Sequence, residues 1–218
     1  MGARLAAPSW LMAGPSLFSD LIWGAAAGLG VFVLALTGLM AWGARPQPLA
    51  AASFGGIALV VVYDLLTALV QESVFRGWLL GEGLRRLRGP AGPVLASGVS
   101  SLGFALIHLT APDTTPSRLL TLLAFGFAAC ALTLRAGTIW PAVGFHAAWN
   151  LALSLGLGGP GAPGASLGAV IALGSSRLAG GPAGLEGSPL TLILCLGLAA
   201  RIGPWRGPMP PPRRNAKA

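Results

Sequence analysis

The 218-residue sequence is short of charged residues and of cysteine, and each shortage excludes a class of protein. Charged residues make up 9% of the chain, whereas a soluble domain has about 25%. With 54% hydrophobic residues as well, the composition excludes a soluble globular domain and predicts a polytopic membrane protein. The two cysteines, Cys130 and Cys195, both lie inside apolar runs, so neither a disulfide framework nor a cysteine-ligated metal site is expected.

Acidic residues are also few, and the formal net charge is +8. Such a charge can indicate nucleic-acid binding, but no RNA- or DNA-binding motif accompanies it here. In a membrane protein it reflects basic cytoplasmic loops more simply, and we therefore expect no nucleic-acid partner.

The apolar runs predict an all-α fold, a transmembrane bundle of about six helices in one domain spanning residues 1–203. Glycine and proline fall largely between these runs, and no internal repeat is apparent. The first run is too long for the apolar part of a signal peptide, so residues 1–16 are expected to be a cytoplasmic lead-in. Residues 45–48 and 158–188 are predicted loops, and 204–218 a disordered, basic, proline-rich tail. The expected helices cover residues 17–42, 53–88, 94–110, 118–134, 138–157 and 189–202.

Six spans place both termini on one side of the membrane, and the basic residues then divide unevenly. One side receives Arg4, Arg85, Arg86, Arg88, Arg135, Arg201, Arg206, Arg213, Arg214 and Lys217, and the other Arg45, Arg118 and Arg177. By the positive-inside rule the richer side is cytoplasmic. We expect a multi-pass protein of a bacterial-type cell membrane with both termini in the cytoplasm.

Polar residues inside the predicted spans are costly and are typically functional. Glu72 and Arg76 lie four residues apart, hence on one helix face, and alone they could be a structural ion pair. The only two histidines of the chain, His108 and His146, also fall within predicted spans, and Asn150 shares the face of His146. Together these polar residues favour a functional site over an isolated structural ion pair.

Helix lengths allow these residues to reach a common depth. Glu72 precedes the turn near Gly89 by about 26 Å of helix, and His108 follows that turn by about 28 Å. His146 lies about 14 Å along its helix from the turn at Gly137, and Glu72 lies about 15 Å from Glu82, where its helix is expected to leave the bilayer. The residue types are those of an acid/base hydrolase, in which a carboxylate and an imidazole activate water. A second imidazole and a carboxamide can donate hydrogen bonds to a developing oxyanion.

The motifs resemble those of the CAAX-protease and bacteriocin-processing (CPBP) family of intramembrane proteases. The matches are Glu-x-x-x-Arg-Gly from Glu72, Phe-x-x-x-His from Phe104 to His108, and His-x-x-x-Asn from His146 to Asn150, within about residues 60–157. The resemblance implies a helical bundle that cleaves peptide bonds of membrane-associated substrates. It also implies two adjacent glutamates of which the first is the general base. Here that position is Gln71, so Glu72 is the carboxylate left for the chemistry.

These residues support three hypotheses about the function, and two about the mechanism, one without a metal and one with zinc. An active intramembrane endopeptidase is the main expectation. A catalytically silent family member that binds a membrane peptide or acts as a scaffold is the alternative, and a transporter or channel is the third. No cofactor is expected to be required. If zinc is bound, its ligands are expected to be Glu72, His108 and His146, although the sequence has no His-Glu-x-x-His helix.

Overall fold

The computed structural model describes residues 16–48, 53–87, 89–111, 114–157, 169–172 and 180–202. The predicted lead-in up to residue 15 and the predicted tail at 204–218 lie outside these ranges. The described elements are α1 (Leu17–Ala41), β1 (Arg45–Pro48), α2 (Phe54–Glu72), the π-helix η2 (Ser73–Leu80), α3 (Gly81–Arg86), α4 (Gly92–Leu106), the 3₁₀-helix η3 (Ile107–Thr110), α5 (Pro116–Ala136), α6 (Trp140–Leu151), the π-helix η4 (Ala152–Gly156), β2 (Ala169–Ala172), the 3₁₀-helix η6 (Gly181–Gly187) and α7 (Pro189–Ile202).

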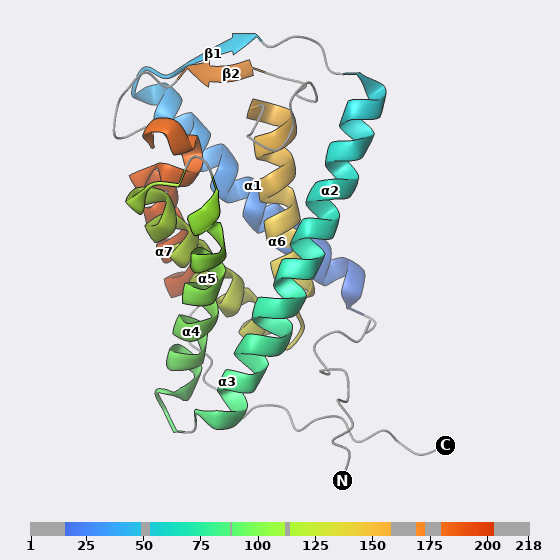
Figure 1. Ribbon diagram of the computed structural model, residues 1–218, viewed down its shortest axis with the longest axis vertical. Helices are drawn as coiled ribbons and strands as arrows, with labels where there is room; N and C mark the ends of the chain where they lie inside the picture. Colours follow the sequence, from blue (N-terminus) through green and yellow to red (C-terminus); the bar gives the residue numbers. More distant parts are fainter. Residues whose placement is uncertain are drawn as a thin grey trace.

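These elements form six helical rods, because α2, η2 and α3 run on continuously, as do α4 with η3 and α6 with η4 (Figure 1). Within the described residues, five segments are long and apolar enough to cross a membrane: Leu17–Ala41, Phe54–Arg86, Gly92–Thr110, Pro116–Ala136 and Gly181–Ile202. The remaining rod, α6 with η4, carries His146 and Asn150. The predicted helical, multi-pass membrane architecture is confirmed.

The predicted loops at 45–48 and 158–188 are partly wrong. Arg45–Pro48 forms strand β1, which pairs antiparallel with β2 in a two-stranded ribbon at one end of the bundle (Figure 1). Proline lacks the amide donor, and Pro46 and Pro48 alternate, so they can lie together on the unpaired edge of β1. Gly181–Gly187, also expected to be loop, forms η6.

Helices α1 and α6 pack closely through glycine. A Cβ atom on Gly24 would lie 1.9 Å from the carbonyl oxygen of Pro141, and one on Gly28 would lie 2.3 Å from that of Phe145. In return, a Cβ on Gly144 would lie 2.2 Å from the carbonyl oxygen of Leu21. Small residues permit such backbone approach between membrane helices. This glycine seam (Gly24, Gly28 and Gly144) fixes α6, and hence His146, against α1.

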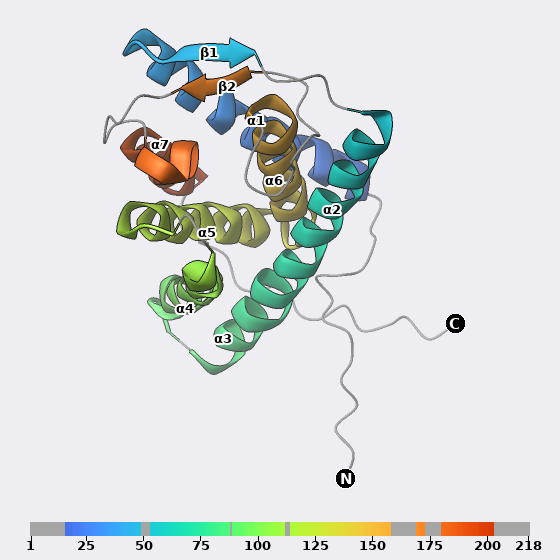
Figure 2. The same cartoon turned by 45° about the horizontal axis from the view of Figure 1, so that its top comes forward.

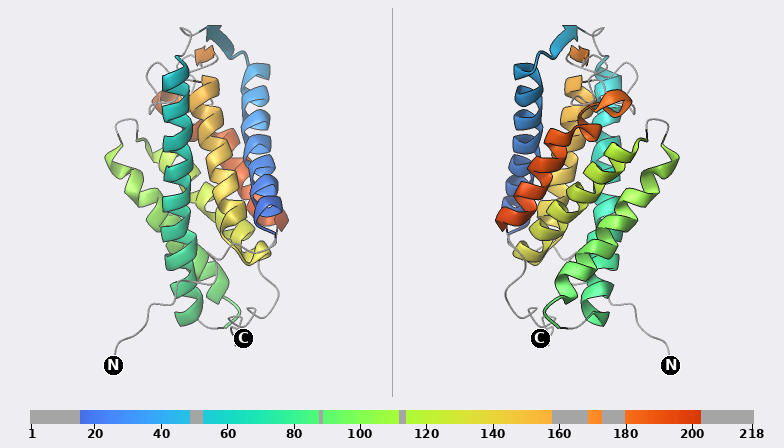
Figure 3. Two further views of the ribbon diagram at one scale, coloured as in Figure 1. Left: turned by 90° about the vertical axis from the view of Figure 1, so that its right-hand side faces the viewer. Right: turned by 90° about the vertical axis from the view of Figure 1, so that its left-hand side faces the viewer.

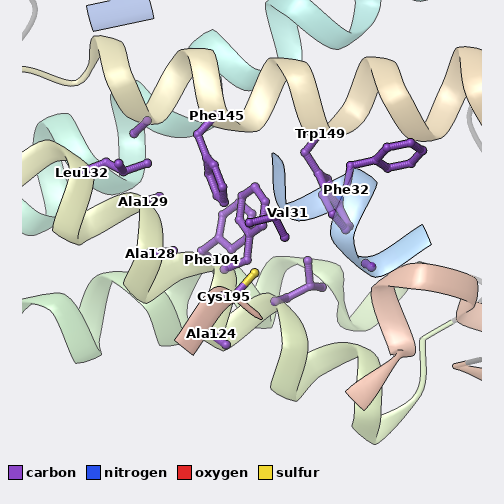
Figure 4. Packing of buried hydrophobic residues seen from close by; sticks show 14 of the residues in the cluster. Val31, Phe32, Phe104, Ala124, Ala128, Ala129, Leu132, Phe145, Trp149 and Cys195 are labelled. Carbon is purple, nitrogen blue, oxygen red and sulfur yellow. The ribbon is translucent and has the colours of Figure 1, made fainter. Parts of the chain in front are cut away.

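Helix α6 lies among α1, α2 and α5, and its apolar side chains join the central core (Figure 2). Phe145 and Trp149 point from α6 toward α5 and α1 (Figure 4). The ring of Trp149 meets that of Phe32 edge-on, with centroids 6.1 Å apart. The ring of Phe145 lies against Phe125 of α5, with centroids 4.4 Å apart.

The turns joining α3 to α4 and α5 to α6 lie at one end of the bundle, together with the start of α1 and the end of α7 (Figure 3). Arg85, Arg86, Arg135 and Arg201 are in the last turns of the helices that end there. The ribbon and the start of α5 lie at the opposite end, because successive rods run in opposite directions (Figure 1).

Candidate functional site

Glu72 and His146 meet in the centre of the bundle. The Nδ1 atom of His146 lies 2.7 Å from Oε1 of Glu72, and Glu72 is fully buried while His146 is 4% exposed. An ionised carboxylate can only accept hydrogen bonds, so this contact places the proton on Nδ1 of His146. The second oxygen of Glu72, Oε2, is buried and has no hydrogen-bond partner among the described residues.

Arg76 holds Glu72 from the next turn of the same rod. Its Nη1 donates to Oε1 of Glu72 at 3.0 Å, and its Nη2 donates to the carbonyl oxygen of Gly126 on α5 at 3.2 Å. The guanidinium is fully buried and lies over the ring of Phe104, 4.6 Å from its centroid. Arg76 therefore joins α2, α4 and α5 at the carboxylate, and its positive charge compensates that of Glu72.

Arg76 reaches Gly126 because α4 and α5 are very close there. A Cβ atom on Gly126 would lie 2.7 Å from Cβ of Ser101 on α4. A larger residue would push the two helices apart and withdraw the carbonyl group from Arg76.

The π-helix η2 shapes the rod directly after Glu72. The wider π turn changes the register of the buried face, and such turns occur often at functional sites. Ser100 of α4 donates a hydrogen bond of 2.7 Å to the carbonyl oxygen of Phe75. Ser100 thus satisfies a backbone acceptor within η2 from a neighbouring helix, which stabilises the wider turn.

The ring of Phe104 connects the two histidines. Its centroid lies 5.0 Å from that of His108 and 5.6 Å from that of His146. His146 also meets the ring of Phe125 edge-on, at 5.4 Å. The imidazole of His146 therefore packs against the rings of Phe104 and Phe125, and that of His108 packs against Phe104.

His108 lies in η3, at the end of α4, and is half-buried. Its Nδ1 donates to the carbonyl oxygen of Phe104 at 2.8 Å, because a carbonyl group can only accept. Thr114 in turn donates to the carbonyl oxygen of His108. In neutral His108 the other ring nitrogen, Nε2, is therefore the one with a lone pair.

Two residues of the predicted site have weaker links to the rest. Asn150 is half-buried on α6, one turn beyond His146, and no hydrogen bond joins it to the other site residues within the described part of the chain. Gln71 is also half-buried, and its side-chain oxygen has no partner there either. The structure thus brings Arg76 and His146 into contact with Glu72, and places both His108 and His146 beside the ring of Phe104.

Asp64 and Ser154 belong to the same surroundings but were not among the residues predicted from the sequence. Asp64 of α2 is 4% exposed, forms a side-chain hydrogen bond with Ser154 of η4, and is close enough to His146 to interact electrostatically. A pattern in the sequence could have revealed it. The buried residues of α2 are Val60, Asp64, Ala68 and Glu72, at a constant spacing of four.

A second buried ion pair lies near His108. Nη2 of Arg118, at the start of α5, lies 2.7 Å from Oε2 of Glu186 in η6. Both side chains are largely buried, and both are close enough to His108 to interact electrostatically. Arg118, assigned from the sequence to the non-cytoplasmic side, is thus paired with Glu186.

The donor atoms do not form a ready metal site. Nowhere in the described ranges do three His, Cys, Asp or Glu side chains come together in an arrangement able to hold a metal ion. Of the expected zinc ligands, Glu72 and His146 are hydrogen-bonded to each other, and Nδ1 of His108 is bonded to the carbonyl oxygen of Phe104.

Comparison with known proteins gives one family. Residues 53–152 match the model of the family described as type II CAAX prenyl endopeptidase Rce1-like. Comparisons with curated proteins and with solved structures gave no match. The matched residues contain Glu72, Arg76, His108, His146 and Asn150. Residues 53–152 form a domain of the Rce1-like CAAX prenyl endopeptidase (CPBP) family of intramembrane proteases.

Proposed function

We propose that this protein is an active intramembrane endopeptidase that hydrolyses peptide bonds of membrane-associated peptides or proteins. The observation that carries the proposal is the buried contact between Glu72 and His146, held by Arg76. Ionisable groups at membrane depth are expensive, and a glutamate in contact with an arginine and a histidine, with a second histidine nearby, has the composition of an acid/base site.

In the proposed reaction Glu72 acts through Oε2. Its other oxygen, Oε1, already accepts from both Arg76 and His146, whereas Oε2 has no partner among the described residues. Oε2 takes a proton from water as the water oxygen attacks the peptide carbonyl carbon, with Nε2 of His108 orienting the water. The proton then passes to the leaving amine nitrogen, which departs as the C–N bond breaks.

The negative charge that develops on the carbonyl oxygen needs donors. We assign this role to Asn150 and to His146, which lie one turn apart on α6. Because Nδ1 of His146 donates to Glu72, His146 donates to the oxyanion through Nε2 when both ring nitrogens carry a proton. Donors of this kind contribute about 3–4 kcal/mol each to the transition state. The mechanism uses no metal, and the alternative is zinc held by Glu72, His108 and His146.

The proposed orientation has both termini in the cytoplasm of a bacterial-type cell. It is supported by the four arginines in the last turns at one end of the bundle, whereas Arg118 at the other end is paired with Glu186. The proposed partners are the lipid bilayer and a membrane-associated substrate.

Gln71 favours a second candidate function. An amide cannot act as a base, and this position resembles that of the family's first glutamate. A member without that carboxylate could bind membrane peptides without cleaving them. Family membership gives no support to the transporter hypothesis.

The test is cleavage of a library of membrane-tethered peptides by the purified protein in liposomes. Wild type is expected to cleave, His108→Ala is expected to lose activity, and Glu82→Gln, at the basic end of the bundle, is expected to behave as wild type. Peptide binding without cleavage by wild type would support the silent binding protein instead.

A further inference from the structure

His108 lies where the rod of α4 is no longer α-helical. Helix α4 ends at Leu106, and η3 continues it as a short 3₁₀-helix that contains His108. The hydrogen bonds of a 3₁₀ turn have poorer geometry than those of an α-helix, and the last carbonyl groups of a helix have no partner within it. The place of the His108 ring therefore depends on the groups that hold this turn.

Thr114 holds the turn at the carbonyl group of His108. The backbone N–H of Ala111 donates to this carbonyl oxygen at 3.1 Å, and the hydroxyl group of Thr114 donates to it at 2.5 Å. The backbone N–H of Thr114 also donates to the carbonyl oxygen of Ala111, at 3.2 Å. Thr114 thus closes the end of η3 with both its hydroxyl and its amide group, and both lone pairs of the His108 carbonyl oxygen are used.

The ring of His108 is held separately, from the preceding turn. Its Nδ1 donates to the carbonyl oxygen of Phe104 at 2.8 Å, and the imidazole packs against the ring of Phe104. The contact with Phe104 orients the ring, whereas Thr114 fixes the backbone from which the ring extends. Together these contacts determine where Nε2 of His108 lies.

The residue after Thr114 fixes the start of the next helix. Thr115 precedes Pro116, which disfavours helical backbone at Thr115, and its φ of −125° and ψ of 158° are extended. The hydroxyl group of Thr115 accepts from the backbone N–H of Arg118 at 3.1 Å and caps α5. Two successive threonines therefore fasten the end of η3 and the start of α5 at one corner, beside His108.

We propose that Thr114 is a positioning residue for His108. This rests on the proposed function, in which Nε2 of His108 orients the attacking water. A displacement of about 1 Å in such a group can lower a rate about 10²-fold. Without the hydroxyl group of Thr114, the carbonyl group of His108 has one donor fewer to hold it. Thr114 lies outside the three sequence motifs, so it extends the site described above.

The activity test replaces the hydroxyl group alone. Thr114→Val keeps the shape of the side chain, and in a cleaving enzyme it is expected to lower kcat about 10- to 100-fold while changing KM less than about threefold. Thr114→Ser keeps the donor and is expected to restore kcat to within about threefold of wild type. A wild-type kcat in Thr114→Val, or an equal loss in Thr114→Ser, would overturn the proposal.

The matched control is Thr37→Val. Thr37 also donates from its hydroxyl group to a backbone carbonyl oxygen, that of Val33, at 2.7 Å, but on the exposed face of α1. Each valine variant is expected to lower the unfolding midpoint by no more than about 2–4 °C, the effect of losing one hydrogen bond. Only Thr114→Val is expected to lower kcat, and an equal loss in Thr37→Val would overturn the proposal.

Hydrogen–deuterium exchange of backbone amides tests the turn without any substrate. In detergent micelles the amide groups of η3 and Ala111 are expected to exchange about tenfold faster in Thr114→Val than in wild type, and at the wild-type rate in Thr114→Ser. A wild type that cleaves nothing but shows this effect would contradict the endopeptidase proposal and leave the hold of Thr114 on His108 intact. A cleaving wild type whose exchange is unchanged in Thr114→Val would contradict the role of Thr114 alone.

Discussion

The Nδ1 atom of His146 lies 2.7 Å from Oε1 of Glu72, although 74 residues separate them in the chain. The contact joins α2 to α6 in the middle of the bundle, where neither side chain has appreciable access to solvent. The imidazole of His146 bonds to Oε1 of Glu72, and Oε2 of Glu72 stays free to take part in the reaction.

Replacing Glu72 tests the general base. Glu72→Gln should lower the cleavage rate by about 10²- to 10⁴-fold, the usual effect of removing such a group. Gln71→Ala should reduce the rate far less. A nearly inactive wild type that gains activity as Gln71→Glu would assign the base to position 71 instead. Initial rates on one membrane-tethered peptide are the measurement.

Arg76 is expected to matter for stability as well as activity. Arg76→Ala leaves Glu72 buried without its cation, and breaking such a pair costs about 3–5 kcal/mol. Arg76→Lys keeps a charge but lacks the two-pronged geometry that reaches both Glu72 and the Gly126 carbonyl group, so it should rescue only part of the loss. Thermal unfolding in detergent measures the loss of stability in Arg76→Ala and its partial recovery in Arg76→Lys.

The matched control for Arg76 is Arg85→Ala. Arg85 also pairs with a glutamate, Glu82, but its side chain is 70% exposed. Exposed pairs contribute about 0–1 kcal/mol, so the unfolding midpoint should hardly move. Equal decreases in the unfolding midpoint of Arg76→Ala and Arg85→Ala would contradict the larger contribution expected from the buried ion pair.

The glycine seam makes a steric prediction. In Gly28→Ala the new methyl group would meet the carbonyl oxygen of Phe145 at 2.3 Å, so α6 must move away from α1. Such overpacking costs about 1–3 kcal/mol, and here it also displaces the neighbouring His146. Gly30→Ala on the same helix has open space around it and serves as the control. Both unfolding midpoint and cleavage rate should fall in the first variant alone.

The ion pair of Arg118 and Glu186 predicts non-additive effects. Glu186→Ala leaves a buried guanidinium and should destabilise the protein, whereas the double variant Arg118→Met, Glu186→Ala should recover much of that loss. A double-mutant cycle on unfolding midpoints checks this. Additive losses would show that the pair contributes no coupling.

Metal dependence is testable directly. We expect the purified protein to keep its activity after chelation with 1,10-phenanthroline and to gain none from added zinc. Loss on chelation with recovery on zinc addition would establish the alternative in which Glu72, His108 and His146 are ligands. Total metal analysis of the same preparation is the companion measurement.

The sequence predicted the six rods because long apolar runs separated by glycine and proline carry a strong signal. Glu72 and His146 were predicted to share a depth from helix lengths alone. Asp64 was missed because its partner, Ser154, is a common residue in membrane helices and carries no signal of its own. Asp64 and Glu72 are eight residues apart, with Ala68 midway, and this repeated spacing of four would have revealed a shared face.

Other features depend on contacts that no local pattern encodes. The π turns of η2 rely partly on Ser100 from another helix, and the pairing of Arg118 with Glu186 spans two distant segments. The ribbon of β1 and β2 likewise joins residues more than a hundred positions apart. Non-local pairings of this kind require the assembled bundle.

The glycine seam also bears on how the protein assembles. Helix α6 carries the histidine and asparagine of the site, and with η4 it is shorter than the five segments that are long and apolar enough to cross a membrane, so it depends more on its neighbours. Its complement, α1, precedes the family-matched residues and is made first. We therefore expect that residues 53–152 do not fold on their own: α6 needs α1 already in the bilayer to pack against, and a chain shortened to the matched residues should insert incompletely.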